Sequence, residues 1–180
     1  MPKADQLDRS KLTALVHYIC AACEDPSVLG GTKLNKVLWY ADMNAFIERG
    51  HSITGETYVK QQFGPVAQHL LPAVKTLEDQ DAIAVRQAPH YAYTKWEYVS
   101  LKQPDISMFK PEEISLVDDM IQIICHKNTA KSISRQTHDV IWELAEIGEE
   151  IPYYAVFASE LGEFTKDDME WAKREVTKMQ

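Results

Sequence analysis

The chain is poor in cysteine and glycine, and the shortage of cysteine limits where it can work. Among its 180 residues there are only three cysteines and seven glycines. An odd and small number of cysteines, in a chain whose polar N-terminal stretch MPKADQLDRSK lacks the apolar centre of a secretory signal, argues for reduced thiols. We therefore expect a cytoplasmic location.

Basic runs and long apolar runs are also missing. The formal net charge is -8, and the sequence contains no run of Lys and Arg. The surface as a whole is therefore not suited to attract nucleic acid or anionic lipid. No apolar run approaches the length of about 20 residues that crosses a bilayer. We expect no direct nucleic-acid partner and no membrane association.

The overall composition, with 45% hydrophobic and 26% charged residues, is typical of a soluble globular protein. A chain of 180 residues suits one domain with a single substantial core. The sequence shows no internal repeat, low-complexity tract or linker. We expect one domain over residues 1–180.

Apolar residues recur at spacings of three and four in several segments, which is typical of amphipathic helices. Capping residues and prolines set the expected bounds. Asp25-Pro26 is expected to end a first helix and Gly50 a second, while Pro65 is expected to begin a third that Pro72 kinks. The first expected helix is capped by Asp8 or Ser10 and carries its apolar stripe between residues 12 and 20. The others cover residues 33–49 after a Thr32 cap, 65–77, 111–127, 130–137, 151–157 and 165–179.

The hydrophobic period changes to two between residues 82 and 100, where Ile83 and Val85 alternate before a turn at 88–90. This alternation predicts a β-hairpin. Residues 56–62 have the β-branched and aromatic content of a strand, and we expect them to join the hairpin in one sheet. The expected fold class is α+β, predominantly helical, in a single domain with a small antiparallel β-sheet or hairpin.

Few residues suggest chemistry. Cys20-x-x-Cys23 has the spacing of half a zinc site, but no second Cys pair follows, and a zinc site needs about four convergent ligands. We expect both cysteines to be small buried helix residues. The stretch at residues 30–33 lacks the spacing of a phosphate-binding loop. No metal, cofactor or catalytic residue is expected.

His138-Asp139 leaves one enzymatic alternative open, a metal-dependent hydrolase that uses this pair. Such a site draws further His and Asp ligands from other helices, and the spacing of the remaining ones selects none. Ser134 does not complete a hydrolase triad, because three neighbours on one short segment cannot easily converge as nucleophile, base and acid. A capped helix end is the preferred interpretation.

Three ordered stretches carry a resemblance: KLNKVLWYAD at residues 33–42, GHSITG at 50–55 and FGPV at 63–66. With Ser132–His138 and Trp142, they resemble the Panacea domain, the family of SocA-like antitoxins and phage-associated GepA-type proteins. The resemblance covers about residues 10–157. The motif positions, expected to be structural, are Lys33, Leu34, Lys36, Tyr40, Phe63, Gly64, Pro65, His138 and Trp142.

Two positions depart from the family pattern. Phe63 and Trp39 stand where the family usually has Tyr, and both replacements keep the aromatic volume. We expect both side chains in the core. Gly64-Pro65 is expected to form a corner between a strand and the third helix, because glycine allows the turn and proline favours helix entry.

The resemblance implies an antitoxin that binds and neutralises a toxin encoded by an adjacent gene, in a prophage-associated setting. It supplies no catalytic residues, so no enzymatic activity is expected. Family members are paired with unrelated toxins, so the target is not identified. The alternative mechanism is a proteolytic adaptor that delivers the toxin to a AAA+ protease, with that protease as a second partner.

Two regions are candidates for the contact with a toxin. Aromatic side chains, which dominate interface hot spots, gather in and before the predicted hairpin. Ten acidic side chains and one lysine lie between residues 139 and 170, which suits a basic partner. The candidate partner-binding residues are Tyr58, Tyr91, Tyr93, Trp96, Tyr98, Glu149 and Glu150.

Overall fold

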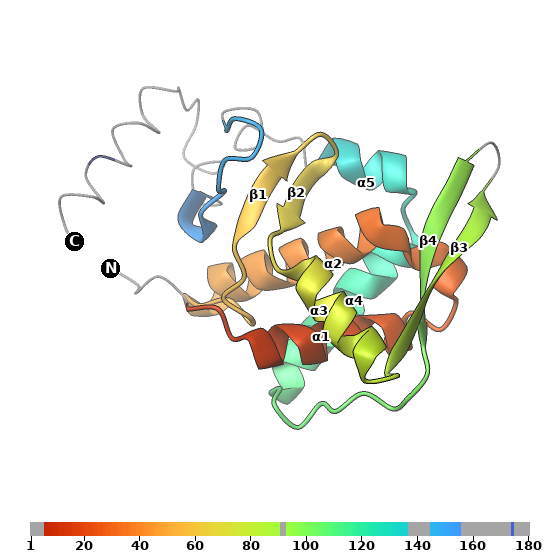
Figure 1. Cartoon of the computed structure of the whole chain (residues 1–180). Coiled ribbons are helices and arrows are strands. Elements are labelled where there is room, and N and C mark those ends of the chain that lie inside the picture. Colours follow the sequence, from red (N-terminus) through yellow and green to blue (C-terminus); the bar gives the residue numbers. More distant parts are fainter. Residues whose placement is uncertain (1–5, 91–92, 137–144, 156–173, 175–180) are drawn as a thin grey trace.

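The structure is a computed structural model that describes residues 6–90, 93–136, 145–155 and 174. Helix α2 runs through the middle of the molecule, with other helices packed around it and two hairpins projecting from it (Figure 1). The fold is α+β and mostly helical, as the sequence predicted. Its helices are α1 (Arg9–Ala22), α2 (Pro26–Arg49), α3 (Leu70–Asp79), α4 (Pro111–Ile121), the π-helix η1 (Gln122–His126) and α5 (Ala130–Gln136); its strands are β1 (Tyr58–Gln61), β2 (Gly64–Ala67), β3 (Ile83–His90) and β4 (Tyr93–Ser100).

Helix α2 begins earlier than the sequence predicted. The Asp25 carboxylate accepts a hydrogen bond from the Ser27 N–H at 2.8 Å, and Pro26 lies in the first turn. Asp25-Pro26 therefore starts this helix, because a proline is tolerated where the N–H has no partner within the helix. Gly30, with φ 60° and ψ 164°, kinks α2 after its first turns, and Gly50, with φ 74°, is the expected left-handed C-cap.

Gly64 and Pro65 do not begin a helix, and the expected strand-to-helix corner is wrong. They lie in β2, which pairs antiparallel with β1 so that Pro65 is opposite Lys60. The backbone N–H and C=O of Lys60 bond outward, to Glu149 O and Gly148 N at 2.8 Å each. Lys60 and Pro65 thus share no hydrogen bond, so the missing proline N–H removes nothing from the ladder.

The third helix starts after this hairpin. Gly64 has φ 107°, a conformation that glycine adopts readily, and it lets the chain reverse after β1. Helix α3 begins at Leu70, and Pro72 falls within its first turn. A proline in the first turn interrupts no helical hydrogen bond, so the predicted kink at Pro72 is wrong.

The two hairpins remain separate in the described part of the chain, where β1 pairs with β2 and β3 with β4. The expected single sheet is therefore wrong. The other edge of β1 is covered instead by residues 148–151, with a bridge between Val59 and Glu150 and a hydrogen bond from Ile151 N to Tyr58 O at 2.8 Å. Strand β1 consequently lies between β2 and this segment.

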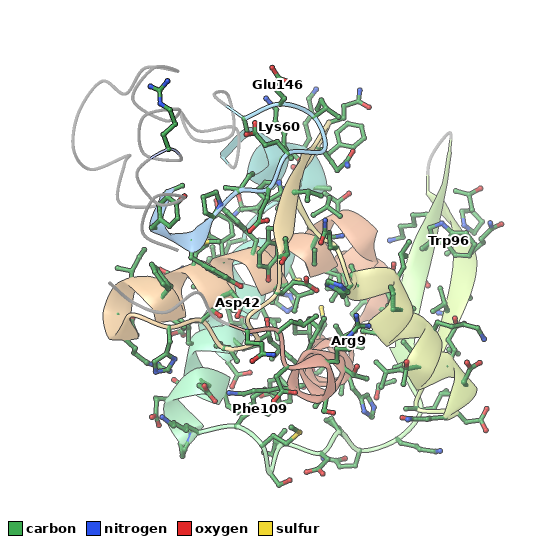
Figure 2. All side chains as sticks on the ribbon, turned by 60° about the vertical axis from the view of Figure 1, so that its left-hand side comes forward. Arg9, Asp42, Lys60, Trp96, Phe109 and Glu146 are labelled. Carbon is green, nitrogen blue, oxygen red and sulfur yellow. The ribbon has the colours of Figure 1, made fainter. Side chains whose placement is uncertain are left out.

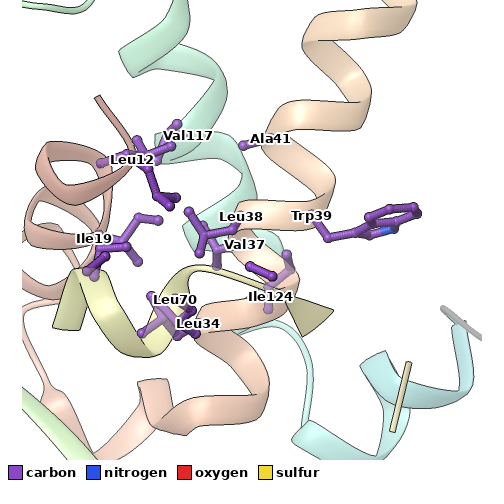
Figure 3. Packing of buried hydrophobic residues seen from close by; sticks show 14 of the residues in the cluster. Leu12, Ile19, Leu34, Val37, Leu38, Trp39, Ala41, Leu70, Val117 and Ile124 are labelled. Atoms are coloured by element: carbon purple, nitrogen blue, oxygen red, sulfur yellow. The ribbon is translucent and has the colours of Figure 1, made fainter. Parts of the chain in front are cut away.

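The hydrophobic core forms where the helices meet around α2. Figure 3 shows Leu12 and Ile19 of α1 facing Leu34 and Leu38 of α2, and other helices contribute to the same cluster. Removing these apolar surfaces from water is the main favourable contribution to folding. Trp39 is buried as predicted, and its ring lies edge-on to that of Tyr58, with 5.0 Å between centroids.

The later helices match the prediction closely up to residue 136. Pro111 opens α4, where Lys110 N donates to the Glu113 carboxylate at 2.9 Å as part of a capping box. Where a helix was expected over residues 151–157, the structure has a short 3₁₀ turn at 153–155, and residues 156–157 lie outside the described ranges. The final predicted helix also lies outside them, except for Arg174, which is helical. None of the helices within the described ranges is long and apolar enough to span a bilayer.

Gly55 packs against Gln6 in the segment before α1, so a substitution at Gly55 can test whether that segment has a fixed position. It has φ 69°, and a Cβ at this position would stand 2.3 Å from the carbonyl oxygen of Gln6. Gly50 has a similar φ of 74°, but a Cβ there would meet nothing within 4 Å. The pair therefore separates backbone strain from steric overlap.

We expect Gly50→Ala to lower the free energy of unfolding by about 1 kcal/mol, the cost of left-handed backbone strain. Gly55→Ala adds the overlap with Gln6 to that strain and should lower it by about 2–4 kcal/mol. Urea unfolding of the two variants and the wild type measures both values. Equal losses would contradict a fixed position of the N-terminal segment.

Candidate functional site

Two motif lysines of α2 lie inside the protein. Lys33 and Lys36 are buried, and each reaches a backbone carbonyl of another element. Lys33 Nζ donates to Cys125 O at 2.8 Å, and Lys36 Nζ donates to Pro65 O at 3.5 Å. A buried ammonium group needs acceptors of this kind, because an uncompensated charge in the interior is strongly destabilising. The two lysines therefore connect α2 to η1 and to β2.

Asn35, between the two lysines, completes the attachment of β2. Its side-chain oxygen accepts a hydrogen bond from Ala67 N at 3.0 Å, and its side-chain nitrogen donates to Gly31 O at 2.9 Å. Together with Lys36 at the Pro65 carbonyl, Asn35 supplies hydrogen-bonding partners to the outer edge of β2. Side chains of α2 thus take the place that a further strand would occupy.

Asp42 organises the loop between α2 and β1. Its carboxylate is fully buried and accepts four hydrogen bonds, from Ile53 N at 2.9 Å, Thr54 N at 3.0 Å, Thr54 Oγ1 at 2.6 Å and Tyr58 OH at 2.7 Å. Burial raises the pKa of Asp42 to about 6, and the hydrogen bonds from Thr54 and Tyr58 oppose that rise. Figure 2 shows Asp42 in the interior, between α2 and the strand that follows the loop.

Glu56 is a second buried carboxylate, placed at the start of α3. It accepts hydrogen bonds from Thr57 N at 2.6 Å, His69 N at 3.1 Å and His69 Nδ1 at 2.8 Å. His69 is the N-cap residue of α3, so the carboxylate lies near the positive end of the helix dipole. The backbone oxygen of Glu56 also accepts the Tyr153 hydroxyl at 2.6 Å, which attaches residues 153–155 to the domain.

The three cysteines are free thiols buried in the core, as predicted for Cys20 and Cys23. The hydrogen-bonding partner of Cys23 is Cys125. A hydrogen bond from the Cys125 thiol, together with the Lys33 ammonium, lowers the pKa of Cys23. Burial raises the pKa of Cys20 to about 12. Cys20-x-x-Cys23 is therefore a packing feature.

The buried polar groups have no opening to a substrate. A shallow cleft of about 570 Å³ lies between α1 and the loop after β4, lined by residues that include Tyr18 and Lys102, and neither Asp42 nor Glu56 lines it. Within the described ranges, no three His, Cys, Asp or Glu side chains come together as metal ligands. His138 and Asp139, the basis of the hydrolase alternative, lie outside those ranges, as does Trp142.

The structure separates the predicted partner-binding residues. Tyr58 is only 1% exposed and Tyr98 is also buried, so neither reaches the surface where a partner contact was expected. Trp96 is 51% exposed on β4. Glu149 is partly exposed and Glu150 exposed, both beside β1, whereas Tyr93 begins β4 and Tyr91 lies outside the described residues.

The motif positions divide in a similar way. Leu34 is buried and Tyr40 half-buried. Phe63 was expected in the core, but it is 62% exposed in the turn between β1 and β2. The polar pair before it and the Gly after it are typical of a hairpin turn, and that signal could have placed Phe63 on the surface. Ile147, 65% exposed, was missed because it follows no periodic pattern.

A comparison with known protein families matches residues 34–143 to the family described as antitoxin SocA-like, Panacea domain. The match extends from α2 past the end of α5 and includes both hairpins. The same chain gave no match to a curated protein or to a solved structure.

The Asp42 network makes the stability depend on pH. Because burial raises the pKa of Asp42 from 3.8 to about 6, the native state binds a proton that the unfolded chain has already released. The resulting stabilisation is fully present below about pH 3.8 and is lost as the pH rises through about 6. The loss amounts to at most about 3 kcal/mol.

We expect the free energy of unfolding of the wild type, relative to Asp42→Asn, to fall between about pH 4 and about pH 7. Urea unfolding of both proteins across this range measures it, and the subtraction removes the contributions of groups that the two proteins share. An increase with pH would instead mean that the four hydrogen bonds outweigh burial at Asp42.

Proposed function

Because this chain belongs to the family of SocA-like antitoxins with a Panacea domain, we propose that it neutralises a cognate toxin by binding it directly. The family match is the observation that carries this proposal, and it covers most of α2 and the elements from β1 to α5. The toxin is the product of an adjacent gene in a prophage-associated setting, and the two proteins meet in the cytoplasm.

The architecture is consistent with stoichiometric binding. A binding module needs a surface held in one conformation, because ordering flexible groups on association costs free energy. The networks around Asp42 and Glu56 fix the loop before β1 and the start of α3, on either side of the β1–β2 hairpin. Phe63 and Trp96 are presented on the two hairpins as exposed aromatic side chains, the type that most often anchors an interface.

Electrostatics favour a basic partner. The formal net charge is -8, and Glu146 and Glu150 are exposed beside β1. Charges of this kind accelerate the encounter with an oppositely charged protein and disfavour other acidic proteins. We therefore expect the toxin to present a basic face and the association rate to fall as the salt concentration rises.

The direct test is co-expression of the chain with the product of the adjacent gene. We expect that product alone to inhibit growth, co-expression to restore growth, and the two proteins to co-purify as a stable complex. The control is co-expression of the adjacent gene with an empty vector that lacks the gene for this chain. Growth restored without a complex would contradict direct neutralisation, and a protease-dependent shortening of the toxin half-life would then identify an adaptor to a AAA+ protease.

A further inference from the structure

Two large apolar side chains stand exposed at the same end of β1. Phe63 lies in the turn that follows β1 and is 62% exposed, and Ile147 is 65% exposed. Ile147 directly precedes Gly148, whose N–H donates to Lys60 O at 2.8 Å, so it comes alongside the residues that lead into the turn. We call Phe63 and Ile147, with the exposed residues Glu146 and Glu150, the hairpin-tip surface.

The hairpin-tip surface is built on a fixed support. The backbone of residues 148–151 is hydrogen-bonded along β1, with Lys60 N donating to Glu149 O at 2.8 Å. The buried Lys60 ammonium donates to Ala145 O at 2.9 Å, just before Glu146. Figure 2 shows Lys60 and Glu146 together at the outer end of β1. A surface fixed in this way loses little conformational entropy when a partner binds.

Within residues 57–68 and 145–152, which build the hairpin-tip surface, the exposed charge has one sign. Residues 57–68 and 145–152 contain a single basic residue, Lys60, and it is buried and directed at the Ala145 carbonyl. Gln61 and Gln62 are exposed and neutral, while Glu146 and Glu150 are exposed and acidic. An apolar centre with a polar rim is the usual arrangement of a protein interface, and here the rim is acidic.

We propose that the toxin docks on the hairpin-tip surface through a basic face that holds an apolar pocket for Phe63. This inference rests on the proposed function and adds the location and the chemistry of the contact. The basic face pairs with Glu146 and Glu150 at the rim, where charge mainly governs the rate and selectivity of association. Phe63 and Ile147 supply the buried centre, which governs dissociation.

The alternative docking surface is the β3–β4 hairpin, here called the ribbon, which carries Trp96. Trp96 is 51% exposed on β4 and shares a face of the ribbon with Gln87 across the ladder, so its paired neighbour is polar. Glu97, next to it on β4, is shared by two cations, Arg86 at 3.0 Å and Lys95 at 3.6 Å. The described charges around Trp96 are therefore basic on balance and offer no acidic rim to a basic partner.

The test compares four variants of the full chain. Phe63→Ala with Ile147→Ala removes the apolar centre, and Glu146→Lys with Glu150→Lys reverses the rim. Trp96→Ala removes the exposed aromatic of the ribbon, and Leu71→Ala removes a 76% exposed apolar side chain on α3 as a matched control. The probe is the product of the adjacent gene, immobilised, and thermal unfolding of each variant verifies that the fold is kept.

We expect loss of the apolar centre to weaken binding at least about tenfold through faster dissociation. Reversal of the rim should slow association about tenfold at low salt, with a smaller effect at high salt. Trp96→Ala and Leu71→Ala should change the affinity less than about threefold.

Unchanged binding after loss of the apolar centre, in a chain whose wild type binds, would overturn the location alone. Loss of binding only in Trp96→Ala would overturn it as well and place the toxin on the ribbon. A wild-type chain that neither binds the adjacent product nor restores growth would refute the proposed function, and the inference with it.

Discussion

The fold depends on a constraint set by α2, the helix against which α1, α4, η1, α5, β2 and β4 pack. This helix directs charged and polar side chains inward, and an unpartnered charge in the interior is strongly destabilising. Each inward polar group therefore requires an acceptor or donor from another element. Lys33 binds η1, Lys36 binds β2, and Asp42 binds the loop before β1. The positions of these elements follow from the need to give each buried polar side chain of α2 a hydrogen-bonding partner.

The buried charges also lie where the backbone can stabilise them. Lys33 meets the Cys125 carbonyl in η1, in the last turn that continues α4, and helix C-termini carry unpaired carbonyls and partial negative charge. Glu56 accepts hydrogen bonds from the backbone N–H and the imidazole Nδ1 of His69, the N-cap residue of α3, at a positive helix end. Asp42 is satisfied by loop N–H groups and hydroxyls. These local arrangements explain how a mostly helical domain accommodates charge in its core.

Local patterns in the sequence predicted the helices and the β3–β4 hairpin, because hydrophobic period and capping act over a few residues. These patterns gave a wrong prediction where the same residue is compatible with two kinds of secondary structure. Pro65 fits the first turn of a helix and also a strand position that donates no hydrogen bond, and only the pairing of Lys60 with Gly148 distinguishes the two. Tyr58 looked like a surface aromatic because its partner, Asp42, lies in another element. Contacts across elements have no local signature, whereas the exposure of Phe63 had one in the turn residues around it.

The division between interior and surface has a consequence for how such a domain acquires a partner. The motif residues Lys33, Leu34 and Lys36 are buried, so they specify the scaffold and leave the target undefined. Exposed residues such as Phe63 and Ile147 contribute little to the core, and substitutions at exposed positions usually change stability only slightly. If the toxin docks at the hairpin tip, as we propose, specificity can change there while the networks of α2 keep the fold. Such a domain would separate the requirement to fold from the requirement to recognise one toxin.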